Sequence, residues 1–140
     1  MKLERKLIRL EDNDMIRVKV KGDWNKTTSW LDKIISRHNF KVMEKYGREG
    51  VAALSASTPV DTGTTASSWD YRIDQTDTSI SLVFVNNNKT KTDIPIVILL
   101  QYGHGNGRGG YVQGRDFINP AVQPVFDKLV EELWKEVIVQ

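Results

Sequence analysis

The sequence contains no cysteine, so it offers no residue for a disulfide, a thiolate metal site or a cysteine nucleophile. It also lacks a long apolar run, because Ile94–Leu100 is far shorter than the roughly 20 residues that span a bilayer. Residues 1–14 interleave charges with leucines and so lack the apolar centre of a signal peptide. We expect a protein assembled in a reducing cytoplasm, without a membrane partner.

An excess of charge of one sign is absent too. Twenty Lys and Arg residues face eighteen Asp and Glu residues, which leaves a net charge of +2. That is too little for bulk binding to a polyanion, so any nucleic-acid contact must be local. Histidine is scarce: His38 falls on the apolar side of a predicted helix, and neither His38 nor His104 has a metal-ligating neighbour at ligand spacing. We expect no metal and no cofactor.

Catalytic patterns are missing as well. The serines at 55, 57, 67 and 68 do not stand in a G-x-S-x-G turn. Asp70 and Asp74 alternate with apolar residues, which indicates the wet face of a strand rather than a carboxylate pair. His104 has no evident partner as a general base. We therefore expect no enzyme, and a hydrolase or nuclease is a third hypothesis without an assignable acid, base or nucleophile.

A length of 140 residues, with 39% hydrophobic and 27% charged residues, is typical of one globular domain. Leu3, Leu7 and Leu10 have helical spacing, but the segment is too short for a stable isolated helix. We assign residues 1–14 to an N-terminal arm and residues 15–140 to a single α+β domain.

Alternating apolar residues predict three strands. The first, near residues 16–21, places Arg17, Lys19 and Lys21 on one basic face. The others, Ser68–Asp74 and the segment with Ile80, Leu82 and Phe84, form a hairpin around a polar turn. In the later strand Val83 and Val85 add apolar residues opposite Ile80, Leu82 and Phe84, so both faces are rather apolar, which favours a central position in the sheet.

Two long helices follow from three- and four-residue spacing. One begins at Ser29, with a capping-box-like Asp32, and ends before Pro59, although Gly47 and Gly50 weaken its second half. The other has Asn119 as its expected N-cap and Pro120 in its first turn. Residues 94–102 fit either a short helix capped by Asp93 or a strand. The sum is an α+β fold with a three- to four-stranded antiparallel sheet, a long central helix and a C-terminal helix.

The segment Gly103–Gly114 holds six of the ten glycines, which predicts a long irregular loop. It matches neither a phosphate-binding loop nor a dinucleotide-binding pattern. Arg108 in a single RGG and the nearby Arg115 add local positive charge. A solvated surface loop explains these features, and so does a loop that becomes ordered against another subunit or DNA.

Further motifs stand in a fixed order. STPVDTG joins the long helix to an aromatic strand, where Asp61 can form an Asx-turn and Gly63 permits a positive φ. A hairpin, LLQYGHG, the glycine loop and Phe117-Ile118-Asn119-Pro120-Ala121 follow. This order resembles the head-tail joining family of long-tailed bacteriophages (neck, tail-completion or minor tail proteins), with a more distant likeness to tail-completion protein Z of lambda-like phages. The likeness covers roughly residues 15–137. Many relatives have Arg-Leu where this chain has Thr64 and Thr65.

The resemblance implies a non-enzymatic virion structural protein that forms a ring at the neck or tail end and is assembled in the host cytoplasm. The ring would be a hexamer, with a dodecamer as the alternative, between a head-closure or connector protein and a tail terminator or tail tube protein. The residues hypothesised to contact other subunits or rings are Asp61, Thr62, Gly63, Tyr102, His104, Arg108, Tyr111, Arg115 and Phe117. An alternative is a DNA-contacting module of the packaging or ejection channel, in which Arg17, Lys19 and Lys21 act with Arg108 and Arg115.

Overall fold

The computed structural model describes residues 2–7, 16–21, 29–59, 63–76 and 79–139. Within these ranges a four-stranded antiparallel sheet has the order β1-β2-β4-β3, and a separate sheet has two strands. The strands are β1 (Lys2–Leu7), β2 (Ile16–Lys21), β3 (Trp69–Gln75), β4 (Ser79–Asn86), β5 (Gly103–Gly105) and β6 (Tyr111–Gln113). The helices are α1 (Ser29–Ser57), the short 3-10 helix η2 (Ala66–Ser68), α2 (Ile96–Tyr102) and α3 (Ile118–Val139). The predicted α+β fold is confirmed.

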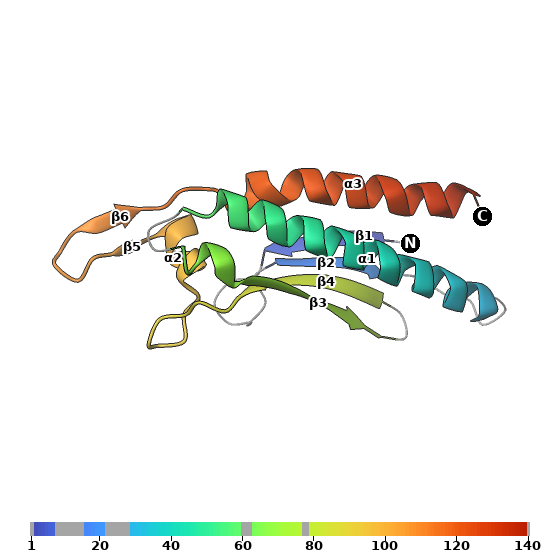
Figure 1. Cartoon of the computed structure of the whole chain (residues 1–140), viewed down its shortest axis with the longest axis horizontal. Helices are drawn as coiled ribbons and strands as arrows, with labels where there is room; N and C mark the ends of the chain where they lie inside the picture. The colour runs from blue at the N-terminus through green and yellow to red at the C-terminus, as the bar shows by residue number, and fades with distance from the viewer. Residues whose placement is uncertain (1, 8–15, 22–28, 60–62, 77–78, 140) are drawn as a thin grey trace.

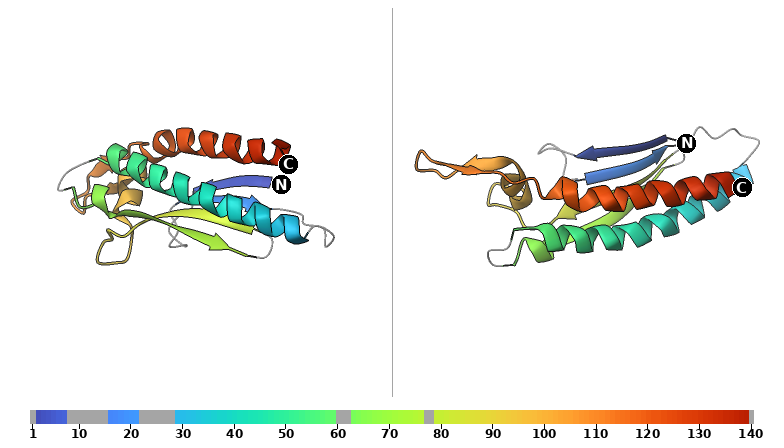
Figure 2. Two further views of the ribbon diagram at one scale, coloured as in Figure 1. Left: turned by 45° about the vertical axis from the view of Figure 1, so that its right-hand side comes forward. Right: turned by 90° about the horizontal axis from the view of Figure 1, so that it is seen from above.

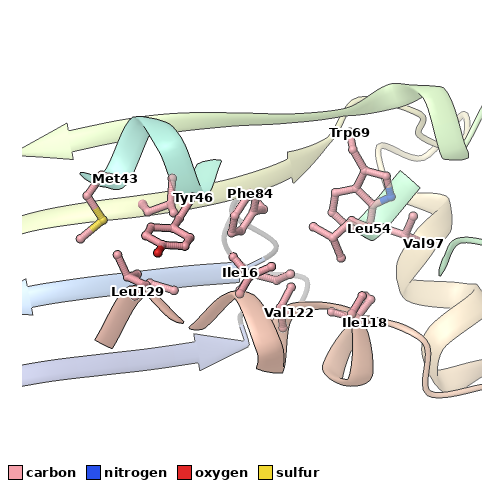
Figure 3. Close-up of a cluster of buried hydrophobic side chains, with 14 of the residues drawn as sticks. Ile16, Met43, Tyr46, Leu54, Trp69, Phe84, Val97, Ile118, Val122 and Leu129 are labelled. Carbon is pink, nitrogen blue, oxygen red and sulfur yellow. The ribbon is translucent and has the colours of Figure 1, made fainter. Parts of the chain in front are cut away.

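The two long helices lie side by side over one face of the four-stranded sheet (Figures 1 and 2). Side chains alternate between the two faces of a strand, so every second residue of β2 and β4 points toward the helices. These residues meet the apolar stripes of α1 and α3 in one core (Figure 3). Its most deeply buried large side chains include Ile16, Met43, Leu54, Leu82, Phe84, Ile118, Leu129 and Leu133.

Strand β4 is central, as its valines predicted, because it pairs with both β2 and β3. Val83 points away from the helices, yet none of its surface is exposed. Its register partners on the two sides are Arg17 and Arg72. Both arginines bind Asp74, with Arg17 Nη2 3.3 Å from Oδ2 and Arg72 Nε 3.2 Å from Oδ1. On the second face of the sheet, Val83 is therefore flanked by two arginines that a common aspartate pairs.

Residues 2–7, which we assigned to an arm, instead form edge strand β1 along the whole length of β2. The spacing of Leu3 and Leu7 fits a period of two as well as a helical period, so the pattern alone is ambiguous. Six residues cannot form a stable isolated helix, whereas pairing with β2 gives their backbone groups partners. The N-terminal segment thus extends the sheet.

Helix α1 continues through Gly47 and Gly50 to Ser57, because both glycines face aromatic rings of the sheet. A Cβ added at Gly47 would lie 2.5 Å from Cδ2 of Tyr71, and one added at Gly50 would lie 2.3 Å from Cζ of Phe84. The helix therefore approaches the sheet more closely than any residue with a side chain would allow. The intrinsic weakness of glycine in a helix is offset by this close packing.

A polar cluster joins α1 to α3. Glu132 accepts a hydrogen bond from the Tyr46 hydroxyl at 2.5 Å, and Nζ of Lys45 lies 3.1 Å from the same Oε2 atom. Burial and the bond to Glu132 raise the pKa of Tyr46 above its ordinary value. The raised pKa stabilises the folded state fully at pH values below the ordinary pKa of tyrosine. This stabilisation is lost as the pH rises through the pKa of Tyr46 in the folded protein.

This cluster predicts a loss of stability in alkali. The melting temperature should fall as pH rises above about 10, the ordinary pKa of tyrosine. The fall should be smaller in Tyr46→Phe, which cannot ionise at this position. Circular dichroism melts of both proteins across the alkaline range would measure it. Parallel falls in both proteins would show that Tyr46 does not contribute.

Candidate interaction surface

The segment that carries the TPVDTG motif is held at both ends. At the first end the Thr58 hydroxyl donates to the Leu54 carbonyl at 2.6 Å and accepts from Trp69 Nε1 at 2.8 Å. At the other end the Thr65 carbonyl accepts from Asn86 Nδ2 at 2.8 Å, and Asn88 Nδ2 lies 2.7 Å from the Thr65 hydroxyl. These bonds fix where the turn leaves α1 and where it returns to the sheet.

Of the motif residues expected to make contacts, Asp61 and Thr62 lie outside the described residues. Gly63 has a φ of 83°, and the motif predicted a positive φ at this residue. A Cβ built on Gly63 would meet no atom within 4 Å, so open space surrounds this position. The hydroxyl of Thr65 accepts a hydrogen bond from the Asn88 amide and so anchors the end of the motif segment.

The glycine-rich segment is a β-hairpin, so the prediction of an irregular loop is wrong. Strand β5 pairs with β6 through Gly103↔Gln113, His104↔Val112 and Gly105↔Tyr111. At its tip, Asn106 Oδ1 accepts N–H groups from Arg108 at 2.9 Å and Gly110 at 3.0 Å. An asparagine side chain that replaces backbone partners is a common way to close a turn. The hairpin is therefore ordered by its own residues.

The base of the hairpin depends on close backbone contact. Gly103 has φ 87°, and the Tyr111 hydroxyl donates to the Tyr102 carbonyl at 3.0 Å. A Cβ on Gly103 would lie 2.4 Å from the Tyr111 hydroxyl oxygen, and one on Gly114 would lie 2.4 Å from the Tyr102 carbonyl carbon. Only glycine fits at these two positions, so the glycines here specify a conformation.

Residues 94–102, for which helix and strand were both open, contain helix α2, which begins after Pro95. The backbone N–H of Asp93 donates to the Thr90 carbonyl at 3.1 Å, and the residue has a positive φ of 65°. Asp93 therefore closes a turn ahead of the helix and does not occupy its N-cap position. Its carboxylate lies 3.3 Å from Nζ of Lys89.

Gln101 at the end of α2 holds the start of α3, a role that the sequence did not reveal. Its Oε1 accepts the N–H groups of Phe117 and Ile118, each at 3.1 Å, and its Nε2 donates to Asp116 Oδ1 at 2.7 Å. The same Asp116 oxygen accepts the N–H of Asn119 at 3.3 Å. The expected N-cap at Asn119 is therefore wrong: α3 begins at Ile118, and Gln101 and Asp116 take its first N–H groups.

The end of α1, helix α2, the start of α3 and the hairpin gather at one end of the molecule (Figures 1 and 2). The hairpin projects beyond the body there, opposite the end where β1 begins and α3 ends. Among the described residues, the exposed large hydrophobic side chains are Tyr111 (64%), Tyr102 (46%), Val112 (44%) and Phe40 (37%). All but Phe40 belong to the hairpin or its base. We call Tyr102, Tyr111 and Val112 the hairpin patch.

The other residues expected to make contacts differ in exposure. Arg108 and Arg115 are exposed, whereas Phe117 is only 3% exposed and packs in the core. Phe117 therefore supports the hairpin base from inside, and we remove it from the contact surface. His104 is half-buried, and among the described residues its Nδ1 is the one buried side-chain nitrogen or oxygen atom without a hydrogen-bond partner.

The basic face of β2 is less open than its sequence suggested. Arg17 is half-buried and paired with Asp74, and Lys19 is half-buried. The side chain of Lys21 lies outside the described residues, as does that of His38. Of the β2 residues proposed to line a DNA channel, the described side chains are therefore Lys19 and an Arg17 whose charge Asp74 partly neutralises.

No protein-family model, curated protein or solved structure matches this chain. In the described ranges, no group of three or more His, Cys, Asp or Glu side chains is placed to hold a metal ion. No helix in that part of the chain is long and apolar enough to cross a membrane.

Proposed function

We propose that this chain is a non-enzymatic structural protein of a long-tailed phage virion, forming a ring that joins the head connector to the tail. The observation that carries the proposal is the hairpin patch, which is held on a preformed hairpin beyond the body of the domain. Exposed apolar side chains on a projecting hairpin favour a protein-protein contact. The ordered motifs TPVDTG and F-x-N-P-A support the same family.

In the proposed ring each copy packs head to tail on the next. Such an interface gives a closed ring when the rotation that relates neighbouring copies adds up to a full turn. In this arrangement Tyr102 and Tyr111 pack on a neighbouring copy, and the turn around Gly63 lies at the same end. A hexamer is the favoured copy number, and a dodecamer is the alternative. The adjoining partners are a head-closure or connector protein on one side and a tail terminator or tail tube protein on the other.

The proposal predicts that the chain is an essential part of the particle. Mass spectrometry of purified virions should find it at a fixed ratio of six or twelve copies to the connector ring. Deleting its gene should leave separate heads and tails in electron micrographs, and supplying the chain from a plasmid should restore joined particles. Virions that lack the chain, or a deletion that leaves infectious yield unchanged, would refute the proposal.

A further inference from the structure

The hairpin has an unbalanced charge. No Asp or Glu occurs from Ile94 to Arg115, and the next residue, Asp116, is bonded to Gln101 and Asn119. Arg108 and Arg115 both lie in or beside the hairpin. Both side chains are exposed, and no ion pair among the described residues involves either of them. By contrast, Arg17 and Arg72 are held by Asp74. The hairpin therefore presents two guanidinium groups whose counter-charge must come from elsewhere.

A second copy of the chain is a poor source of that counter-charge in its described part. Four of its carboxylates already bind basic side chains, namely those of Asp74, Asp93, Glu131 and Glu132. The exposed Glu49 lies next to Arg48 on α1, and Asp127 binds the Gln123 amide. The exposed Asp70 lies on β3, so the carboxylates in the described part of a second copy are spread over several elements and offer no concentrated counter-charge. A polyanion compensates them better.

The shape of the hairpin also suits a polyanion. A two-stranded β-ribbon has a width that the major groove of B-DNA admits. The hairpin extends away from both long helices, so the body of the domain does not block its approach (Figure 2). Gly105 has no side chain and is not crowded by its neighbours, which lets the backbone of β5 come close to a ligand at that position. The bonds of Asn106 and Tyr111 order the hairpin in advance, so binding has little ordering cost.

We propose that the β5–β6 hairpin binds duplex DNA, with the Arg108 and Arg115 guanidinium groups on backbone phosphates and no reading of base sequence. This inference separates the two arginines from the hairpin patch, which contacts protein in the proposed ring. It stands without the ring, although several copies around one duplex would add their weak contacts. Two phosphate contacts per chain correspond to a slope of log affinity against log salt of about −2.

The test is fluorescence anisotropy of the full chain with a labelled duplex of about 20 base pairs, at salt from about 20 to 200 mM. The wild type should bind with the salt slope given above. Arg108→Gln with Arg115→Gln should weaken binding by at least about tenfold at low salt and flatten the slope. The matched control is Arg37→Gln with Arg48→Gln on the exposed face of α1, which removes the same charge and should change affinity less than about twofold.

Three results would overturn the inference. The first is no saturable binding at low salt, and the second is an equal loss in both double variants, which would show an effect of net charge alone. The third is unchanged DNA binding in the hairpin variant together with loss of self-association in sedimentation, which would assign the arginines to protein contacts. Unchanged melting temperatures would show that each variant is folded. None of these results bears on whether the chain is present in virions, so the ring proposal is tested separately.

Discussion

Replacing Gln101 by methionine should lower the free energy of unfolding by about 3 kcal/mol, although the two side chains have similar volume. Gln101 is 7% exposed, and its amide oxygen accepts the N–H groups of Phe117 and Ile118. Phe117 and Ile118 are themselves buried, so water cannot replace the lost acceptor. Each buried N–H left without a partner costs about 1–3 kcal/mol, and the bond to Asp116 is lost as well.

Urea unfolding followed by tryptophan fluorescence would measure this change. The matched control is Gln113→Met, which makes the same substitution at an exposed position of β6 and should shift stability by no more than about 0.5 kcal/mol. If the two variants unfold at the same urea concentration, the Gln101 amide does not hold α3. A loss confined to Gln101→Met would show that the start of α3 depends on a residue of α2.

The elements that sequence periodicity predicted correctly are those with a regular apolar face. Strand β2, helix α1, the β3–β4 hairpin and helix α3 each repeat apolar residues with a period of two or near 3.6. Burial of that repeated face dominates their stability, so a local pattern is sufficient to find them. The central place of β4 was predictable for the same reason, because Val83 and Val85 lie opposite Ile80, Leu82 and Phe84 and make both faces apolar.

The hairpin was missed because its stability does not come from an apolar pattern. Glycines contribute no side-chain periodicity, and the pairing of β5 with β6 rests on the Asn106 bonds and on the Tyr111 hydroxyl. The sequence signal for a closed turn was Asn106 followed by glycines at 107 and 109, and both glycines have a positive φ in the structure. A high glycine content therefore indicated special backbone conformations here, and not irregular structure.

The part of the α3 cap that Gln101 supplies could not be predicted locally, because Gln101 precedes Ile118 by 17 residues and reaches it only through the tertiary fold. Asp116, three residues before Asn119, was the local N-cap signal. Asn119 has good N-cap chemistry, but its own N–H is taken by Asp116. Phe117 was placed among the contact residues because of its motif, whereas the fold buries its ring. A motif shows that a residue matters without showing which way its side chain points.

Gly50→Ala should destabilise the protein by about 2 kcal/mol, the reverse of what helix propensity alone predicts. Alanine in place of glycine favours an exposed helix by up to about 1 kcal/mol. At Gly50, however, the new methyl group would lie 2.3 Å from Cζ and 2.5 Å from Cε1 of Phe84, a ring that is 1% exposed. Either the ring or the helix must move, and overpacking of this kind typically costs about 1–3 kcal/mol.

Because the clash involves one ring, a double-mutant cycle can assign it. In a Phe84→Leu background, Gly50→Ala should cost less than it does in the wild type, since the leucine side chain lacks the ring edge that the methyl group meets. Ala52→Gly at an exposed position of the same helix provides the intrinsic propensity term, expected at about 1 kcal/mol. Equal costs of Gly50→Ala in both backgrounds would rule out the Phe84 contact as the reason for glycine. A reduced cost would mean that α1 keeps a residue unfavourable to helices so that it can lie against the central strand of the sheet.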